Sequence, residues 1–141
     1  MFMIILFLVL TALFWGLAPI FDKIAVTNIH VLPALTFRSI VVTLFLLVAT
    51  FIYGKSDVLF NMGVKSTLAL SGSALSAGLL GMLTYYSALR LGPTSKIVPL
   101  AATYPLITAL LGMVFLGETV TSWRLFGIIL IIVGIWLVLI K

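Results

Sequence analysis

The sequence contains no cysteine, one histidine and only three acidic residues, and charged residues make up 8% of its 141 positions. Without cysteine it can form neither a disulfide framework nor a thiolate metal site. It also has no paired carboxylates, no glycine-rich phosphate loop and no histidine within an apolar run. Acid–base and nucleophilic catalysis depend on such groups. The sequence therefore argues against an enzyme, and it predicts no catalytic residue, no metal site and no cofactor.

Apolar residues take the place of the missing charge and make up 64% of the chain. Soluble domains carry about 25% charged residues, so this chain could not build a polar shell. The net charge of +5 does not indicate nucleic acid, because lysines and arginines stand singly in the breaks between apolar runs. Anionic lipid headgroups would meet them there. We therefore predict an all-α membrane protein.

Five apolar segments are long enough to cross about 30 Å of hydrocarbon as helices. They are predicted at residues 2–21, 32–53, 66–89, 97–116 and 123–140. The first segment is uncharged and has no basic residue before it, whereas a cleaved signal has a basic start and an apolar core of about 7–15 residues. We expect a membrane span there, and a single five-helix transmembrane domain over residues 1–141.

The fourth span carries two prolines, Pro99 and Pro105, which predict a break in the helix. Pro105 has no N–H to donate to the carbonyl of Ala101. In a membrane, a hydroxyl, a water or a ligand must satisfy that carbonyl. Thr103, Tyr104 and Thr108 are close enough to serve as that hydroxyl. The break is either part of a site or a purely structural kink.

The third span is rich in small and hydroxyl-bearing residues. At about 100° per residue, one face of this helix collects several hydroxyl groups. These are Ser73, Ser76, Thr84 and Ser87. The face either lines a polar cavity or bonds to neighbouring helices.

Glycines predict two surfaces for close helix packing. Gly78 and Gly81 lie on another face of the third span, and Gly127 and Gly134 lie seven residues apart in the fifth. Small residues let the backbones of two membrane helices approach each other. We expect neighbouring helices, from this chain or a partner, to pack at these positions.

The three carboxylates, Asp22, Asp57 and Glu118, are expected at span ends or in links, with residues 22–31 forming a polar link. A buried acid is the natural partner of a cationic drug or a coupling proton. Its absence at mid-membrane favours a neutral, zwitterionic or anionic substrate and argues against carboxylate-driven proton coupling. Arg38, about two turns into the second span, either snorkels to the headgroups or faces a cavity.

Five spans put the two termini on opposite sides of the membrane, and the basic residues give little orientation bias. The N-terminal side holds Lys55, Lys65 and Arg124, and the other side holds Lys23, Arg38, Arg90, Lys96 and Lys141. Setting aside the two that border apolar spans, Lys23 and Arg38, leaves three against three. Cytoplasmic loops normally carry an excess of lysine and arginine, which fixes the orientation of a membrane protein. A chain without such an excess can insert both ways and form an inverted pair.

An ordered set of short motifs covers nearly the whole chain. It comprises Trp15-Gly16, Phe21 and Lys23, Pro33 with Phe37-Arg38, Tyr86 with Ala88-Leu89, Pro99 and Pro105, Leu116-Gly117-Glu118, and Gly127 with Gly134. This set resembles one EamA domain of the drug/metabolite transporter superfamily. Members typically carry two such five-helix domains of opposite orientation around a central cavity. The resemblance therefore implies that this chain, with one domain, pairs with an antiparallel second copy or with another half-transporter.

In that family the first, third and fourth helices of each half supply much of the cavity wall. The resemblance nominates Trp15, Ser73, Ser76, Tyr86, Thr103 and Tyr104 for the substrate cavity, with Lys23 and Arg38 near its mouth. By its own position, Trp15 is either an interfacial anchor or a cavity residue.

The favoured function is a secondary transporter or exporter of small metabolites, working by alternating access as an antiparallel homodimer. The expected location is the inner cell membrane, with several passes. The expected partners are lipid, a second copy and a small-molecule substrate, and no nucleic acid. The alternatives are a translocator of lipids or lipid-linked sugars, and a membrane assembly subunit that transports nothing.

Overall fold

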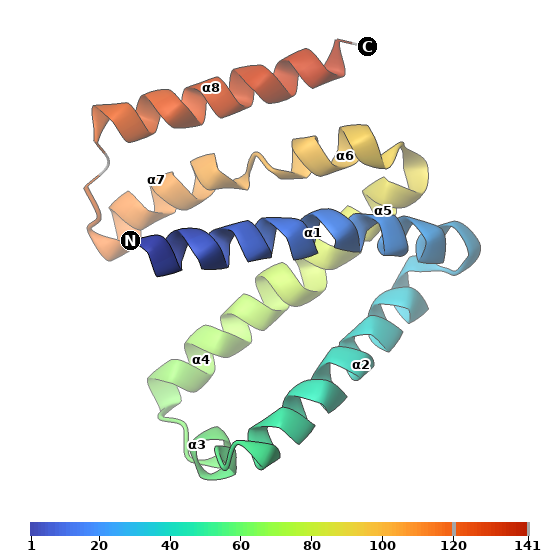
Figure 1. Cartoon of the computed structure of the whole chain (residues 1–141), viewed down its shortest axis with the longest axis vertical. Helices are drawn as coiled ribbons and strands as arrows, with labels where there is room; N and C mark the ends of the chain where they lie inside the picture. Colours follow the sequence, from blue (N-terminus) through green and yellow to red (C-terminus); the bar gives the residue numbers. More distant parts are fainter. Residues whose placement is uncertain (120, 141) are drawn as a thin grey trace. The chain divides into compact units, whose positions relative to one another are not determined.

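The computed structural model describes residues 1–119 and 121–140, so Lys141 of the charge count lies outside the described residues. The helices are α1 (Phe2–Asn28), α2 (Val31–Ile52), α3 (Ser56–Phe60), α4 (Val64–Ser73), the π-helix η1 (Ala74–Gly81), α5 (Met82–Leu91), α6 (Thr94–Ala101), α7 (Tyr104–Leu116) and α8 (Ser122–Leu139) (Figure 1). Five helical stretches are long and apolar enough to span a bilayer. The prediction of an all-α protein with five membrane helices is confirmed.

The first helix is longer than predicted. The expected polar link over residues 22–31 is wrong, because α1 continues to Asn28 and the chain turns only at Ile29 and His30. No glycine or proline interrupts this stretch, and the side chains of Thr27 and Asn28 donate to carbonyls four residues earlier, at 2.8 and 3.1 Å. His30 then caps α2, since its Nδ1 accepts from the backbone N–H of Leu32 at 3.3 Å. Asp22 therefore lies inside a spanning helix.

The third span runs unbroken from Val64 to Leu91 as α4, η1 and α5. Its middle is wound as a π-helix, whose hydrogen bonds join residues five apart rather than four. Positions before and after η1 therefore do not keep the phase of a regular α-helix, and the single hydroxyl face expected for Ser73, Ser76, Thr84 and Ser87 does not hold across it. Hydroxyls of the last three donate to carbonyls of their own helix at 2.7–2.9 Å.

Two glycines of this span should respond oppositely to alanine. A Cβ at Gly72, in α4, would meet nothing within 4 Å, so Gly72→Ala should raise the free energy of unfolding by about 0.5–1 kcal/mol. A Cβ at Gly81 would lie 3.1 Å from the carbonyl oxygen of Ser76. Because overpacking typically costs about 1–3 kcal/mol, Gly81→Ala should be the less stable variant by about 1 kcal/mol or more. Unfolding in detergent measures both, and equal stabilities would contradict the tight π-turn at Gly81.

The fourth span is broken between its two prolines. α6 ends at Ala101 and α7 begins at Tyr104. At the break the Thr103 hydroxyl donates to the carbonyl of Leu100 at 3.0 Å, so it serves that carbonyl rather than the expected carbonyl of Ala101. Pro105 lies in the first turn of α7, where a missing N–H costs no helical hydrogen bond.

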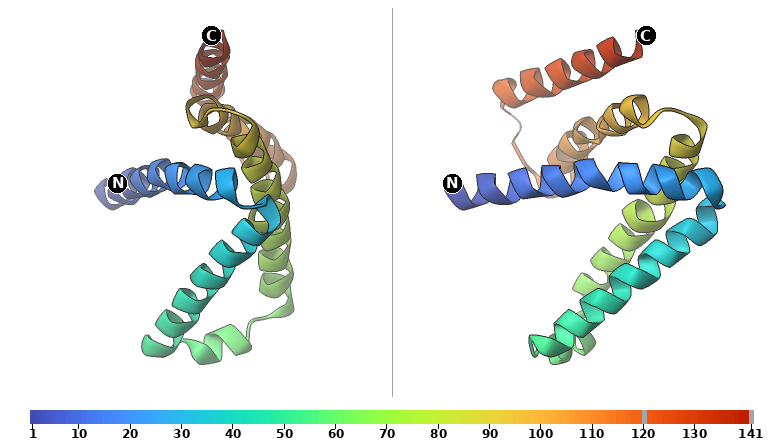
Figure 2. Two further views of the ribbon diagram at one scale, coloured as in Figure 1. Left: turned by 90° about the vertical axis from the view of Figure 1, so that its right-hand side faces the viewer. Right: turned by 45° about the vertical axis from the view of Figure 1, so that its right-hand side comes forward.

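The chain forms two compact units, Met1–Leu91 and Gly92–Lys141, which are described separately; the prediction of a single domain stays a prediction. In the first unit α1 and α2 both contact α5, and Figure 2 shows α2 running back from the end of α1. Its buried apolar core is small. It consists of Val26, Val31, Leu35, Tyr86 and Leu89. In the second unit α6 contacts α8, which Thr121 caps through its hydroxyl at 3.4 Å.

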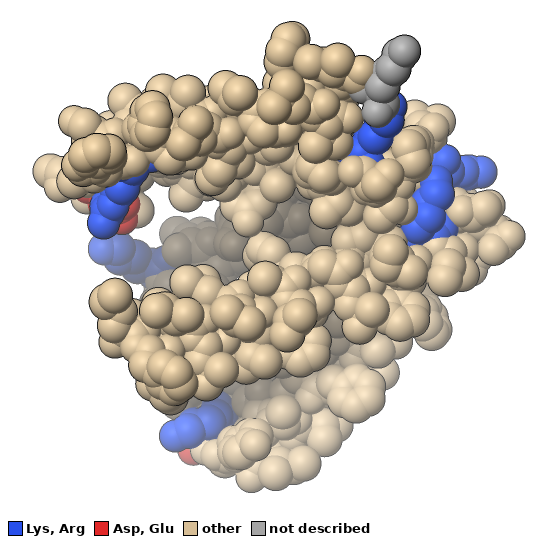
Figure 3. All heavy atoms as spheres, turned by 45° about the horizontal axis from the view of Figure 1, so that its top comes forward, with Lys and Arg blue, Asp and Glu red and all other residues tan. Residues whose placement is uncertain are grey.

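Outside this core, large apolar side chains are exposed on every spanning helix. Phe7 of α1 is 59% exposed, Phe45 of α2 75% and Phe115 of α7 78%. Figure 3 shows charged side chains in small separate groups, with uncharged residues over the surface between them. A helix that is apolar on all sides needs either a protein core or lipid around it. Few residues of these helices are buried in protein, so the chain is a multi-pass membrane protein.

Candidate functional site

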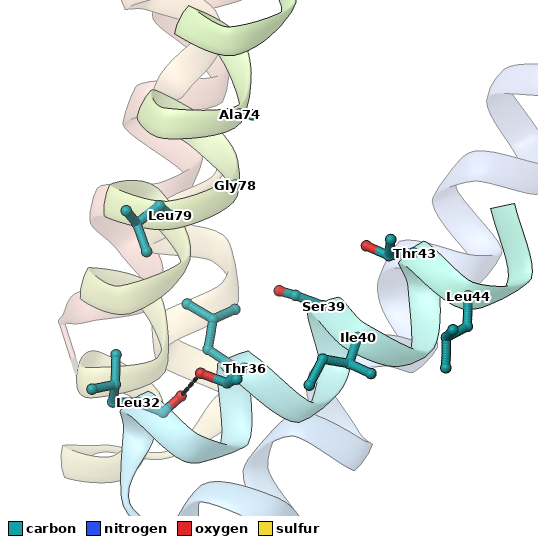
Figure 4. A pocket seen from close by; sticks show the side chains of 10 residues that line it. Leu32, Thr36, Ser39, Ile40, Thr43, Leu44, Ala74, Gly78 and Leu79 are labelled. Carbon is teal, nitrogen blue, oxygen red and sulfur yellow. Dashed lines mark hydrogen bonds between the residues drawn. The ribbon is translucent and has the colours of Figure 1, made fainter. Parts of the chain in front are cut away.

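A groove of about 560 Å³ lies in the first unit, between α2 and the helix formed by α4 and η1 (Figure 4). α2 contributes three hydroxyl-bearing residues, Thr36, Ser39 and Thr43, and the facing wall contributes Ala74 and Gly78. Leucine and isoleucine side chains complete the lining. This volume is in the usual range of about 300–1,000 Å³ for small-molecule sites.

The local sequence explains both walls of the groove. Thr36, Ser39 and Thr43 are three and four residues apart, a spacing that places side chains on one face of an α-helix. Across from them, Gly78 has no side chain, and an added Cβ would meet nothing within 4 Å. The groove therefore exists because small residues of η1 leave room opposite a row of hydroxyl groups.

The three hydroxyls differ in their hydrogen bonding. Thr36 donates to the carbonyl of Leu32 in its own helix at 2.9 Å. Within the described part of the chain, Ser39 and Thr43 have no hydrogen-bond partner, and Figure 4 shows both pointing across the gap toward η1. Hydrocarbon cannot satisfy a hydroxyl group. An occupant with hydrogen-bonding groups of its own would suit this groove better than a lipid tail.

A second polar arrangement, which we call the α1–α5 contact, joins the two helices through Asp22, Lys23, Tyr86 and Leu89. The Tyr86 hydroxyl donates to Oδ1 of Asp22 at 2.5 Å, and the Tyr86 side chain is 2% exposed. The Lys23 ammonium group donates to the carbonyl of Leu89. Charged groups thus hold α1 against α5 inside the most buried part of the unit.

The structure places the residues predicted for the first unit's cavity wall away from the groove. Trp15 is 65% exposed on α1, and Ser73 and Ser76 are exposed on other faces of α4 and η1. Tyr86 and Lys23 take part in the α1–α5 contact. Their assignment to a substrate cavity or its mouth remains a prediction.

The remaining predicted positions are distributed over both units. Arg38 is exposed on α2, and Gly78 lines the groove, so its role in helix packing stays a prediction. In the second unit Thr103 and Tyr104 lie at the break between α6 and α7, with Pro99 before it. A Cβ at either Gly127 or Gly134 of α8 would meet nothing within 4 Å. These two glycines therefore have space for a partner, and their packing role is still a prediction.

Sequence reasoning missed the hydroxyl row of α2 and the contact between Asp22 and Tyr86. The spacing of Thr36, Ser39 and Thr43 is visible in the sequence, and a search of the second span for a polar face would have found it. The Asp22–Tyr86 pair joins residues 64 positions apart. Its only local signal is that no helix breaker follows Asp22 before Asn28.

Comparison with known proteins indicates the family of this chain. The family model described as "EamA-like transporter family" matches residues 2–140. The chain is 29% identical over 126 residues to an uncharacterized protein of Methanocaldococcus jannaschii, covering 89% of this chain and 88% of that protein. It is 27% identical over 125 residues to an "uncharacterized transporter in cobO 3′ region" of Sinorhizobium sp, with coverages of 89% and 88%. No solved structure matches the chain significantly.

Proposed function

Because the chain belongs to the EamA-like transporter family, we propose that it is a secondary transporter of small metabolites that works by alternating access in the inner cell membrane. The observation that carries this proposal is the family match over residues 2–140 of a chain with five spanning helices. A relative that is named a transporter supports it. Enzymatic activity has no part in the proposal, since the family is one of transporters.

The lining of the α2–η1 groove supports an uncharged, hydrogen-bonding solute. None of the residues that line it carries a charge, and Ser39 and Thr43 have hydroxyls without a partner in the described structure. A charged solute would lose its hydration there without gaining an opposite charge. Sugars, polyols and amides would gain hydrogen bonds in the groove and would lose less hydration free energy than a charged solute. The sequence favours neutral, zwitterionic or anionic substrates, and the lining of the groove narrows this range to the neutral ones.

An antiparallel pair of chains is the arrangement we propose for transport. Many transporters place the substrate between two repeats of inverted topology, and alternating access rocks one repeat against the other. This chain has five spanning helices, an odd number, and its basic residues are balanced between the two sides once Lys23 and Arg38 are set aside. A second copy inserted the other way would supply the inverted repeat.

Two charge-reduced variants test this arrangement. The first variant removes positive charge from one side by two substitutions, Lys55→Ser and Lys65→Ser. The second removes it from the other side by Arg90→Ser and Lys96→Ser. Each variant should insert in a single orientation, opposite for the two variants, because loops that carry positive charge stay in the cytoplasm. Each variant alone should lose most uptake of glycerol or a hexose, and co-expression of the two should restore it. Reporter fusions at both termini record the orientations.

The solute panel also contains a neutral amino acid, a monocarboxylate and tetraphenylphosphonium. If each charge-reduced variant alone transports as well as the original chain, the antiparallel pair is wrong. If proteoliposomes move none of these solutes but move a fluorescent lipid between leaflets, the translocator alternative replaces small-solute transport. If they move neither, the chain is an assembly subunit.

A further inference from the structure

We propose that η1 is a reversible gate of the α2–η1 groove, which is open in the π winding of this structure and closes when η1 rewinds as an α-helix. The inference rests on the proposed transport function and deepens it, because it supplies two states for alternating access. It is carried by the position of η1 in the groove wall and by hydroxyl bridges at both of its ends.

Hydroxyl groups support both ends of η1. The Ser76 hydroxyl donates to the carbonyls three and four residues before it, at 3.3 and 2.8 Å. The Thr84 hydroxyl also donates to the carbonyls three and four residues before it, at 2.9 Å each. In membrane helices such side chains and local π winding satisfy backbone groups that a regular helix would leave free. The two bridges therefore stabilise the π winding relative to a uniform α-helix.

The backbone of η1 opposes this stabilisation. Gly81 follows Ser76 by five residues, the spacing of a π-helical hydrogen bond, and a Cβ at Gly81 would lie 3.1 Å from the Ser76 carbonyl oxygen. At the end of η1 the N–H of Met82 donates to the carbonyl of Leu79, only three residues earlier. π-helices are rare and mostly one turn long, whereas η1 covers eight residues. Side-chain support of an irregular backbone suits two windings of similar free energy.

The helix before η1 is free to turn, whereas the helix after it is fixed. α5 contacts both α1 and α2, and its Tyr86 and Leu89 are 2% and 0% exposed. α4 has no buried residue, and within the described part of the chain its extensive contacts are with η1 alone. Rewinding of η1 therefore turns α4 and the first residues of η1 and leaves α5 in place.

Rewinding exchanges small residues for large ones in the groove wall. A π-helical bond spans one residue more than an α-helical bond, so the change moves each residue before the junction by one position, about 100° and about 1.5 Å. Since α5 is fixed, the residue that follows takes its place. Leu75 then replaces Ala74, and Leu79 moves toward the place of Gly78. Leucines opposite the hydroxyl row of α2 fill the space that small residues leave, so the groove closes.

The first experiment reads the winding by cross-linking and needs no transport. The chain has no cysteine, so Thr43→Cys is combined with either Ala74→Cys or Leu75→Cys. A short bis-maleimide should join the Ala74→Cys pair in the π winding and the Leu75→Cys pair in the α winding, and without further changes both pairs should react. Gly81→Ala should raise the yield of the Leu75→Cys pair relative to the other by about 5-fold or more, the lower end for overpacking.

Three further substitutions control this result. Ser76→Ala and Thr84→Val each remove a hydroxyl bridge and should shift the yields in the same direction, so the test does not depend on the folding of Gly81→Ala. Gly72→Ala is the matched control and should leave the ratio unchanged, because its Cβ meets nothing within 4 Å and its carbonyl still accepts from Ser76. A ratio that the other three substitutions do not move, or that Gly72→Ala moves equally, overturns the inference whatever the chain transports.

The second experiment measures initial uptake into proteoliposomes of a solute that the original chain moves. Gly81→Ala should lower uptake by about 5-fold or more, and adding Leu75→Ala should return it to within about 2-fold of the original, because alanine leaves the groove open in either winding. If Leu75→Ala brings no recovery, closure by η1 is wrong and transport stands. If no solute moves at all, the proposed function fails, and the cross-linking ratio alone decides whether η1 rewinds.

Discussion

Gly78→Leu is expected to reduce solute uptake by about 100-fold, because it places a large side chain in the α2–η1 groove. Gly78 lines the groove opposite Ser39 and Thr43, and a Cβ there meets nothing within 4 Å, so the helix accepts the new side chain without strain. The leucine would occupy the space of the solute and screen both hydroxyls. Overpacking costs about 1–3 kcal/mol, which corresponds to roughly 5- to 150-fold in affinity. Initial uptake rates in proteoliposomes, at equal protein content, measure the effect.

Gly72→Leu is the matched control for this substitution. Gly72 lies on the same continuous helix, is exposed, and also has nothing within 4 Å of an added Cβ. It does not belong to the groove lining. Leucine at this position should leave uptake within about 2-fold of the original chain, in line with the small effects of surface changes. Equal losses in the two variants would mean that the groove is not the solute path.

Tyr86→Ala is expected to be the most destabilising single substitution in the first unit, lowering the free energy of unfolding by about 3–5 kcal/mol. The Tyr86 side chain is 2% exposed, in the small core shared by α1, α2 and α5. Alanine removes the ring and also leaves the Asp22 carboxylate without its tyrosine donor. Chemical unfolding in detergent micelles, followed by helical circular dichroism, measures the loss.

Two variants separate the contributions of the ring and the hydroxyl. Tyr86→Phe keeps the packing and loses the hydrogen bond, so we expect a loss of about 1–2 kcal/mol, near the upper end of values measured in membranes. Tyr53→Ala removes a tyrosine that is 77% exposed at the end of α2, and should change stability by less than about 0.5 kcal/mol. If Tyr86→Ala costs no more than Tyr53→Ala, the core assigned to the first unit is wrong.

The sequence predicted the spanning helices well and the polar contacts poorly, for reasons that particular residues show. Runs such as residues 32–53 have little choice in lipid, because a helix satisfies all its own backbone groups. The end of α1 was misplaced because Asp22 and Lys23 were read as a boundary, although a tyrosine and a backbone carbonyl from α5 satisfy them. Polarity marks a helix end only when no tertiary partner is present.

The prediction of a single hydroxyl face on the third span was wrong for a different reason. A wheel at about 100° per residue assumes uniform winding, whereas η1 is wound as a π-helix over Ala74–Gly81. No residue type in that stretch signals a π-helix. The register shift means that Thr84 and Ser87, which follow η1, do not continue the face of Ser73 and Ser76. The groove depends on which helix lies opposite Ala74 and Gly78, and periodicity along one helix does not contain that information.

Composition and the lengths of the apolar runs were sufficient to establish a five-span helical membrane protein, and its ordered motifs to indicate the family. Both are local properties, since the bilayer imposes helix formation on each run separately and each motif is read in place. The position of Ser39 and Thr43 opposite η1, and the contact of Asp22 with Tyr86, emerged only from the folded chain. Both arrangements bring together residues far apart in sequence, and they depend on how the helices wind and cross, which no single segment encodes.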